Sequence, residues 1–295
     1  MVITMVGYLW QRIRHDPARR DFVVRGTGRP EWLIALAGRK NHPRVEKRGI
    51  AMNQAAQDLI LETRGLSKHF GGIQVINQVD LQIRRGEVRC VIGPNGAGKS
   101  TFFKLLTGEH TPSEGDIRFF NRRLNTLAPF QHIRMGMSIK FQIPGIFPEL
   151  TVEQHLQLSL SHLRPEVSSQ AVSVDELLER FKLSAEYHQL AGNLSHGKKQ
   201  WLEIAMAVSL QPTLLMLDEP VAGLSIDETY LTGELIKQMQ GDGLTLMVVE
   251  HDMTFVRQIA SQVTVLHGGQ VFADGNAAEV LAREDVADIY LGKAV

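Results

Sequence analysis

The chain has 295 residues, of which 43% are hydrophobic and 22% are charged. This length and apolar content are enough for one large domain or two modest ones, and they exclude wholesale disorder. Lys and Arg together number 32, as do Asp and Glu, so no overall positive charge indicates nucleic-acid binding. The single cysteine, Cys90, excludes an intramolecular disulfide framework and fits a reducing compartment. No apolar run reaches the roughly 18–20 residues that cross a bilayer, so any membrane role would depend on a partner.

Residues 1–57 form a basic extension with eleven Lys and Arg against four Asp and Glu. Its apolar opening, residues 1–10, precedes the positive charges, which is the reverse of their order in a secretory signal. Three interpretations stay open. The segment is a basic arm for anionic lipid headgroups, a short packed element, or either a weakly ordered tail or sequence upstream of a start at Met52. We expect weak order over residues 1–57 and one folded domain over residues 58–295.

From Asp58 onward the pattern of apolar residues and turns becomes regular. Apolar runs bounded by glycine-containing turns predict three strands, and a helix follows a glycine-rich loop: Leu59–Glu62, Gln74–Ile83, Val88–Ile92 and then Lys99–Leu106. The middle section, Val152–Val208, has leucines at helical spacing and predicts a helical insertion, placed at about residues 145–208.

Strand and helix alternate again after the insertion. The pattern predicts two buried strands, two helices and a hairpin: Leu214–Leu217, Leu244–Val249, Asp227–Gln240, Val256–Ala260, and Val263–His267 with Gln270–Ala273. Two α/β portions around a helical insertion indicate an α/β fold with a mostly parallel core sheet. Cys90, within the strand before the glycine-rich loop, is expected to be a small buried core residue.

The glycine-rich loop carries the strongest chemical signal. It reads Gly93-Pro94-Asn95-Gly96-Ala97-Gly98-Lys99-Ser100 and fits the pattern G-x-x-x-x-G-K-[ST] between a strand and a helix. Small residues let backbone N–H groups surround phosphate oxygens, and the start of the helix adds its positive dipole end. Lys99 is then expected at the β- and γ-phosphates, the Ser100 hydroxyl at Mg²⁺, and Thr101 at a further phosphate oxygen.

A second signal is the pair of carboxylates that ends the apolar run Leu214–Leu217. Ligands bind at the carboxyl ends of buried parallel strands, so Asp218 is placed to bind Mg²⁺. Glu219, one residue on, is placed to polarise the water that attacks the γ-phosphate. An isolated Asp-Glu pair is more often a solvated loop start, and the phosphate loop upstream makes the functional interpretation the stronger one.

Further motifs, in the same order along the chain, resemble those of the ATP-binding cassette (ABC) family. The sequence Leu194-Ser195-His196-Gly197-Lys198 resembles the family signature, usually Leu-Ser-Gly-Gly-Gln. Gln142 matches the Q-loop glutamine, Ala222-Gly223-Leu224-Ser225 occupies the D-loop position, and His251 matches the switch histidine. Phe70 lies where an aromatic side chain usually stacks on adenine, although a core aromatic would give the same pattern. The resemblance covers about residues 59–270 and implies a cassette with an antiparallel β portion and a helical subdomain.

The resemblance also implies that ATP is held between two such domains. One chain would supply the phosphate loop and the groups that act on the γ-phosphate and its Mg²⁺: Gln142, Asp218, Glu219 and His251. The facing chain would supply Ser195 and Gly197 of its signature. Two residues depart from the usual signature, because His196 replaces the first glycine and Lys198 replaces the glutamine. We expect Lys198 to be solvated and assign neither residue a role.

The resemblance further implies a transport ATPase over a soluble cassette that acts on DNA or ribosomes. The chain has no long coiled-coil insertion and no second phosphate loop. The segments Gln200-Trp201-Leu202-Glu203-Ile204 and Ile289-Tyr290-Leu291-Gly292, with His196 and Gly197, are similar to the urea-importer branch of the branched-chain amino-acid importers. The implied partners are membrane permease subunits, a second ATPase subunit of the same or another kind and, indirectly, a periplasmic solute-binding protein, with no nucleic acid. The implied place is the cytoplasmic face of the inner membrane, and a branched-chain amino acid or a short-chain amide is the alternative cargo.

Overall fold

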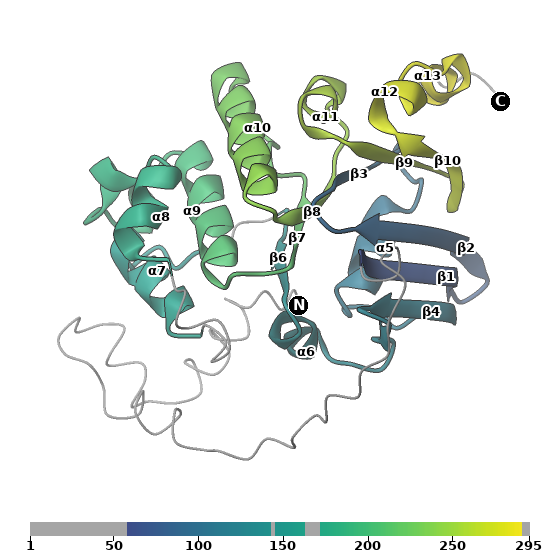
Figure 1. Ribbon diagram of the computed structural model, residues 1–295, viewed down its shortest axis with the longest axis horizontal. Coiled ribbons are helices and arrows are strands. Elements are labelled where there is room, and N and C mark those ends of the chain that lie inside the picture. Colours follow the sequence, from purple (N-terminus) through teal and green to yellow (C-terminus); the bar gives the residue numbers. More distant parts are fainter. Residues whose placement is uncertain (1–57, 143–144, 163–171, 291–295) are drawn as a thin grey trace.

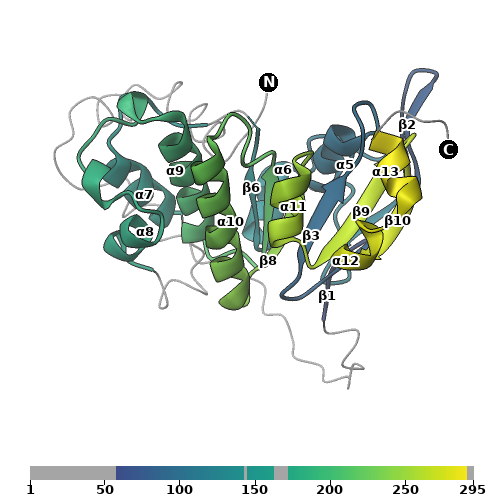
Figure 2. The same cartoon turned by 90° about the horizontal axis from the view of Figure 1, so that it is seen from above.

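The computed structural model describes residues 58–142, 145–162 and 172–290. The basic extension over residues 1–57 therefore lies outside the described residues. The described chain forms two β-sheets with helices packed around and between them (Figures 1 and 2). Among these residues, no helix combines the length and the apolar character that a bilayer span requires.

The first sheet is antiparallel and has the strand order β2-β1-β4-β5. Its strands are β1 (Leu59–Phe70), β2 (Ile73–Arg84), β4 (Glu114–Phe119) and β5 (Arg122–Arg123). The strand predicted over Leu59–Glu62 is thus much longer, because its register with β2 continues through bulges to the turn at residues 71 and 72. The prediction of an antiparallel portion is confirmed.

The second sheet has the order β10-β9-β3-β8-β7-β6 and is parallel except at β10, which pairs with β9 as a hairpin. Its strands are β3 (Val88–Ile92), β6 (Met137–Lys140), β7 (Leu214–Asp218), β8 (Thr245–Val249), β9 (Gln262–His267) and β10 (Gln270–Asn276). β3 and β8 are buried along their whole length, as expected for strands covered on both faces. The predicted mostly parallel core sheet is confirmed.

The helices are distributed over both faces of this parallel sheet (Figure 2). They are α5 (Lys99–Leu106), α6 (Pro129–Arg134), α7 (Val152–Leu160), α8 (Val174–Arg180), α9 (His196–Ser209), α10 (Ile226–Gly241), α11 (Met253–Ile259), α12 (Ala277–Val280) and α13 (Glu284–Tyr290). Short 3₁₀ turns lie at Ser184–Glu186 and Ala191–Asn193. α7, α8 and α9 lie together at one end of the molecule beside α10, and α5 lies between the two sheets.

Two apolar cores follow from this layering. One packs α7–α11 against one face of the parallel sheet, and the other fills the space between the two sheets around α5. β3 contributes to both cores, because Cys90 faces the first and Val91 faces the second. Cys90 is fully buried, as predicted.

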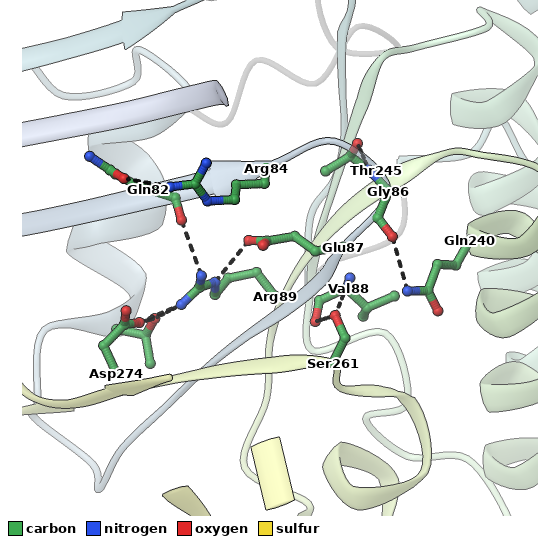
Figure 3. Close-up of polar contacts among 11 residues, drawn as sticks. Gln82, Arg84, Gly86, Glu87, Val88, Arg89, Gln240, Thr245, Ser261 and Asp274 are labelled. Atoms are coloured by element: carbon green, nitrogen blue, oxygen red, sulfur yellow. Dashed lines mark hydrogen bonds and ion pairs between the residues drawn. The ribbon is translucent and has the colours of Figure 1, made fainter. Parts of the chain in front are cut away.

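One buried arginine joins the two sheets at the amino-terminal end of β3 (Figure 3). Arg89 donates to the carbonyl oxygen of Gln82 in β2 at 3.1 Å and to Thr264 in β9 at 3.1 Å. It also pairs with Asp274 in β10 and, through Nε, with Glu87 at 3.0 Å. Beside it the turn before β3 is fixed, since Gly86 donates to the Thr245 hydroxyl at 2.9 Å. The strand that leads into the phosphate loop is therefore anchored to three other strands and one turn.

Candidate functional site

Four predicted motifs meet at one edge of the parallel sheet. β3, β8, β7 and β6 are neighbours and run in the same direction, so their carboxyl ends share an edge. The phosphate loop follows β3, His251 follows β8, Asp218 ends β7 and Gln142 follows β6. The topology therefore brings together residues that are more than 150 positions apart in the sequence.

The phosphate loop has the backbone that its sequence predicts. Gly98 is the N-cap of α5 and has φ +99°, a left-handed conformation that favours glycine. A Cβ at this position would lie 2.7 Å from Ile76 Cδ1 and 2.9 Å from the Val75 carbonyl oxygen. Asn95, Gly96 and Ser100 are exposed, and Thr101 is partly buried in the first turn. The first N–H groups of α5 have no partner within the helix, which suits a phosphate group.

Lys99 lies under this loop with only 8% of its surface exposed. Its Nζ donates to the carbonyl oxygens of Gly93 at 2.6 Å and Pro94 at 3.0 Å. Burial lowers the pKa of the ammonium group, and the nearby carboxylates of Glu219 and Asp218 oppose that shift. The charge is thus held at the centre of the loop, where it can exchange its two carbonyl partners for phosphate oxygens.

The two carboxylates at the end of β7 have different surroundings. Burial first, and then the charge of Glu219, raise the pKa of Asp218 to about 6. A divalent cation fits this position, because its charge would offset both the cost of burying the Asp218 carboxylate and the repulsion from Glu219. The Asp218 carboxylate, the Ser100 hydroxyl and the Gln142 amide oxygen are oxygen donors of the kind that Mg²⁺ prefers.

Glu219 lies between the side chains of two other predicted site residues. Gln142 Nε2 donates to Glu219 Oε2 at 2.8 Å, and His251 Nδ1 lies 3.6 Å from Glu219 Oε1. The backbone of Glu219 has φ +44°, and its N–H donates to the Val249 carbonyl oxygen at 2.9 Å. A non-glycine residue in this conformation is uncommon and occurs at functional sites. The carboxylate is therefore aimed by its backbone and by neighbours from β6 and β8.

Phe70 is not a core residue. It is 44% exposed at the end of β1, its ring meets the His110 ring edge-on at 5.3 Å, and Lys68 Nζ lies 4.9 Å from its centre. An exposed aromatic ring suits stacking on a base. His110, which the sequence analysis did not single out, is the ring partner at this position.

Ser195 and Gly197 lie apart from the other predicted residues. Both are at the start of α9, and α10 lies between α9 and α5 in both views (Figures 1 and 2). The Ser195 hydroxyl accepts the N–H of Lys198 at 3.3 Å, and a Cβ on Gly197 would lie 2.3 Å from Glu228 Oε1. Within one chain, these two residues do not join the phosphate loop.

Comparisons with known proteins identify the family of the chain. Residues 76–222 match the family model described as ABC transporter. The chain is 37% identical over 251 residues to the high-affinity branched-chain amino acid transport ATP-binding protein LivG of Escherichia coli K12, covering 80% of this chain and 98% of the relative. The corresponding protein BraF of Pseudomonas aeruginosa is 35% identical with the same coverage. The chain belongs to the ABC transporter ATP-binding family.

Solved structures lead to the same fold. A nucleotide-free ATP-binding cassette from an ABC transporter superposes with a TM-score of 0.70 at 28% identity, covering 80% of this chain and 100% of the other. The ADP conformation of the cassette MJ1267 gives a TM-score of 0.70 at 29% identity, covering 80% and 99%. The protein is thus an ATP-hydrolysing transporter subunit with a P-loop cassette fold.

The prediction for Lys198 in the cassette signature is wrong. Lys198 is not simply solvated, because its Nζ donates to the Lys182 carbonyl oxygen and lies 3.3 Å from Glu186 Oε2. The same ammonium group lies 5.4 Å from the centre of the Trp201 ring. Lys198 therefore joins the start of α9 to the turn that follows α8.

Glu250 is a residue of the cassette to which the sequence assigned no role. Its carboxylate is 1% exposed and accepts the N–H groups of His251 at 2.8 Å and Asp252 at 3.2 Å. Burial raises its pKa, and these N–H groups oppose the shift. The available signal in the sequence was an acidic residue directly after the apolar run Leu246–Val249, because an ionisable group next to a buried strand needs a specific partner.

Proposed function

We propose that this chain hydrolyses Mg·ATP at the edge formed by β3, β8, β7 and β6 and thereby drives the import of a solute. The observation that carries the proposal is the position of Glu219 between Gln142 and His251, one residue after Asp218. A carboxylate held by two neighbours, and adjacent to a cation ligand, can orient and polarise an attacking water.

The other residues have separate roles in this proposal. The phosphate loop, through Gly93, Asn95, Gly96, Gly98, Lys99, Ser100 and Thr101, binds the phosphates, and Phe70 stacks on the base. Ser100, Gln142 and Asp218 hold Mg²⁺, which when bound would neutralise charge on the phosphate oxygens. His251 orients the γ-phosphate and the water. Ser195 and Gly197 serve the nucleotide of a facing ATPase subunit, and their distance from the loop of their own chain supports this arrangement.

The test of this chemistry is Glu219→Gln, which keeps the size of the side chain and removes the base. We expect ATP affinity within about threefold of the unaltered protein and turnover lower by about 10³-fold, in the range that general-base catalysis and positioning contribute. Phosphate release and binding of a fluorescent ATP analogue measure the two quantities. Glu179→Gln, an exposed glutamate on α8, is the matched control.

Lys99→Ala separates binding from chemistry. We expect it to weaken ATP binding itself, because it removes the charge at the centre of the phosphate loop. Near-normal turnover by Glu219→Gln would remove Glu219 as the base, and unchanged ATP affinity in Lys99→Ala would remove the assignment of the phosphate site.

The cargo and the partners complete the proposal. The subunit acts at the cytoplasmic face of the inner membrane with permease subunits, a second ATPase subunit and, indirectly, a periplasmic solute-binding protein, without nucleic acid. We propose urea as the cargo, on the similarity around His196 and Trp201. The names of the relatives LivG and BraF support branched-chain amino acids as the second candidate.

Uptake by the source cell decides between the two cargoes. Cells that carry Glu219→Gln are tested with labelled urea, leucine and a short-chain amide in parallel, and with Glu179→Gln as control. Loss of urea uptake alone supports the first cargo, and loss of leucine uptake alone supports the second. If no uptake changes, the assignment of a cargo is wrong while the ATPase chemistry is tested separately.

A further inference from the structure

His196 is one of the two residues at which the signature departs from the usual pattern, and its side chain has a specific contact. His196 Nε2 lies 3.0 Å from the carbonyl oxygen of Ala222, in the D-loop of the same chain. A carbonyl oxygen only accepts, so Nε2 carries the proton and donates it to this bond. The usual glycine at this position has no side chain and could not make the contact.

The D-loop has a glycine, Gly223, next to the His196 ring. Gly223 has φ +75°, and a Cβ built on it would lie 3.3 Å from His196 Nε2. Glycine therefore provides both the backbone conformation and the space for the imidazole at this point. The next contacts continue along the two helices: Gly197 packs closely against Glu228, and the Trp201 indole N–H donates to the Thr232 hydroxyl at 2.9 Å in a buried position. The start of α9 is thus fastened to the D-loop and to α10.

Val221, the residue directly before the D-loop, is linked to the switch region. Val221 N–H faces Glu250 Oε1 at 3.4 Å, and Glu250 Oε2 accepts the N–H of His251 at 2.8 Å. The Glu219 N–H is bonded to the Val249 carbonyl oxygen. A continuous series of polar contacts therefore runs from His196 through the D-loop and Glu250 to His251, the residue beside Glu219.

We propose that His196 is a positioning residue that fixes the D-loop of its own chain and, through Glu250, the position of His251. The inference rests on the proposed function, in which the signature faces the nucleotide of the other subunit. His196 would then connect the signature, which acts on one nucleotide, to the switch histidine, which acts on the other. If the signature shifts when it binds one nucleotide, the hydrogen bond from His196 to the D-loop changes. The position of His251 at the second nucleotide then changes as well.

The experiment compares His196→Ala with His196→Gln in the full chain. Alanine removes the donor, whereas the glutamine amide nitrogen stands the same number of bonds from Cβ as Nε2 and can donate in its place. We expect His196→Ala to lower kcat for ATP hydrolysis by about threefold to tenfold with KM for ATP within about twofold, the range for losing one neutral hydrogen bond. His196→Gln is expected to retain more than half of the kcat. His188→Ala, an exposed histidine elsewhere on the helical side, is the matched control.

Hydrogen exchange adds a readout that separates positioning from general damage. The amides of residues 221–225 are expected to exchange faster in His196→Ala and at the normal rate in His196→Gln. In a double-mutant cycle with Glu250→Gln, the loss in kcat of the double variant is expected to be smaller than the product of the two single losses, because both residues act through the same loop.

Three results would overturn the inference. They are unchanged kcat in His196→Ala, equal losses in His196→Ala and His196→Gln, and a rise in KM that accounts for the whole loss. The inference and the proposed function fail differently. If Lys99→Ala abolishes ATP binding while His196→Ala is silent, only the role of His196 is wrong, whereas normal ATP binding in Lys99→Ala removes the site on which both depend.

Discussion

At the scale of single residues, the charge of Asp218 lowers the stability of the folded protein at the proposed cation site. Its carboxyl group is partly buried next to Glu219, and its pKa is raised to about 6 from an ordinary value near 4. The folded protein therefore binds a proton between about pH 4 and 6 that the unfolded chain has released. Stability falls as pH rises through this window, and above pH 6 the full electrostatic cost is present.

Asp218→Asn is expected to make the protein more stable and unable to use Mg²⁺. At pH 7.5 we expect Tm to rise by about 2–4 °C, because the neutral amide avoids burial of a charge and repulsion by Glu219. The difference from the unaltered protein should vanish below pH 4, where both are neutral at this position. Thermal unfolding from pH 4 to 8 and Mg²⁺-dependent nucleotide binding are the measurements.

Asp227→Asn is the control for this prediction, because it also removes one carboxylate charge but from an exposed and favourable position. Asp227 is exposed in the first turn of α10, where its charge is favourable with the helix dipole, so its removal should leave Tm unchanged or slightly lower. A fall in Tm for Asp218→Asn at pH 7.5 would contradict the explanation.

At the scale of elements, the segment after Gln142 is fastened to two helices. The N–H of Gly145 donates to Glu203 Oε1 in α9, and the N–H of Phe147 donates to His155 Nε2 in α7 at 2.9 Å. His155 in turn donates through Nδ1 to the Thr151 carbonyl oxygen at 2.8 Å, which sets its tautomer. Burial raises the pKa of Glu203 to about 7 and lowers that of His155.

Glu203→Ala is expected to release this segment from α9. The amide of Gly145 should exchange about tenfold faster, because its buried acceptor is gone. Glu203→Gln keeps an acceptor oxygen and should exchange at close to the normal rate, and Glu179→Ala controls for loss of an exposed charge in the same region. Equal protection of Gly145 in Glu203→Ala would show that Glu203 does not hold the segment.

The elements that carry the site were predictable, and several of their neighbours were not. The mostly apolar strand before Gly93 and the apolar run before Asp218 could be recognised from their composition, and the helix that begins at Lys99 follows the glycine-rich loop that ends at Gly98. β4 and β6 were not predicted, because short runs with mixed polarity have no distinct period. The contacts of Lys198 and Glu203 were equally hidden, since their partners depend on tertiary structure.

For the whole molecule, the order of the strands decides where the motifs meet. The sequence predicted parallel strands but not the order β3-β8-β7-β6, which depends on the connections between them. Only the structure shows which strands are neighbours in the sheet, and only the structure shows that the antiparallel sheet packs over α5. Arg89 is a polar link between those layers, and its apolar neighbours Val88 and Cys90 did not indicate this role (Figure 3).

Arg89→Met is expected to destabilise the whole cassette by about 2–4 kcal/mol, because it leaves Glu87 and the Gln82 carbonyl oxygen without their donor in a mostly buried place. Urea unfolding measures the loss. Arg123→Met, which removes an exposed pair with Asp116, is expected to cost less than about 1 kcal/mol. Equal losses in the two variants would show that Arg89 does not join the sheets.

The carbonyl partners of Lys99 have a consequence for which ligands can displace them. The Lys99 ammonium group donates to the Gly93 and Pro94 carbonyl oxygens, so a phosphate that binds Lys99 must compete with two good acceptors. A nucleoside monophosphate, which brings only one phosphate, offers little in return, whereas a di- or triphosphate presents several charged oxygens at once. We therefore expect the loop to favour di- and triphosphates over monophosphates before contacts to the base contribute.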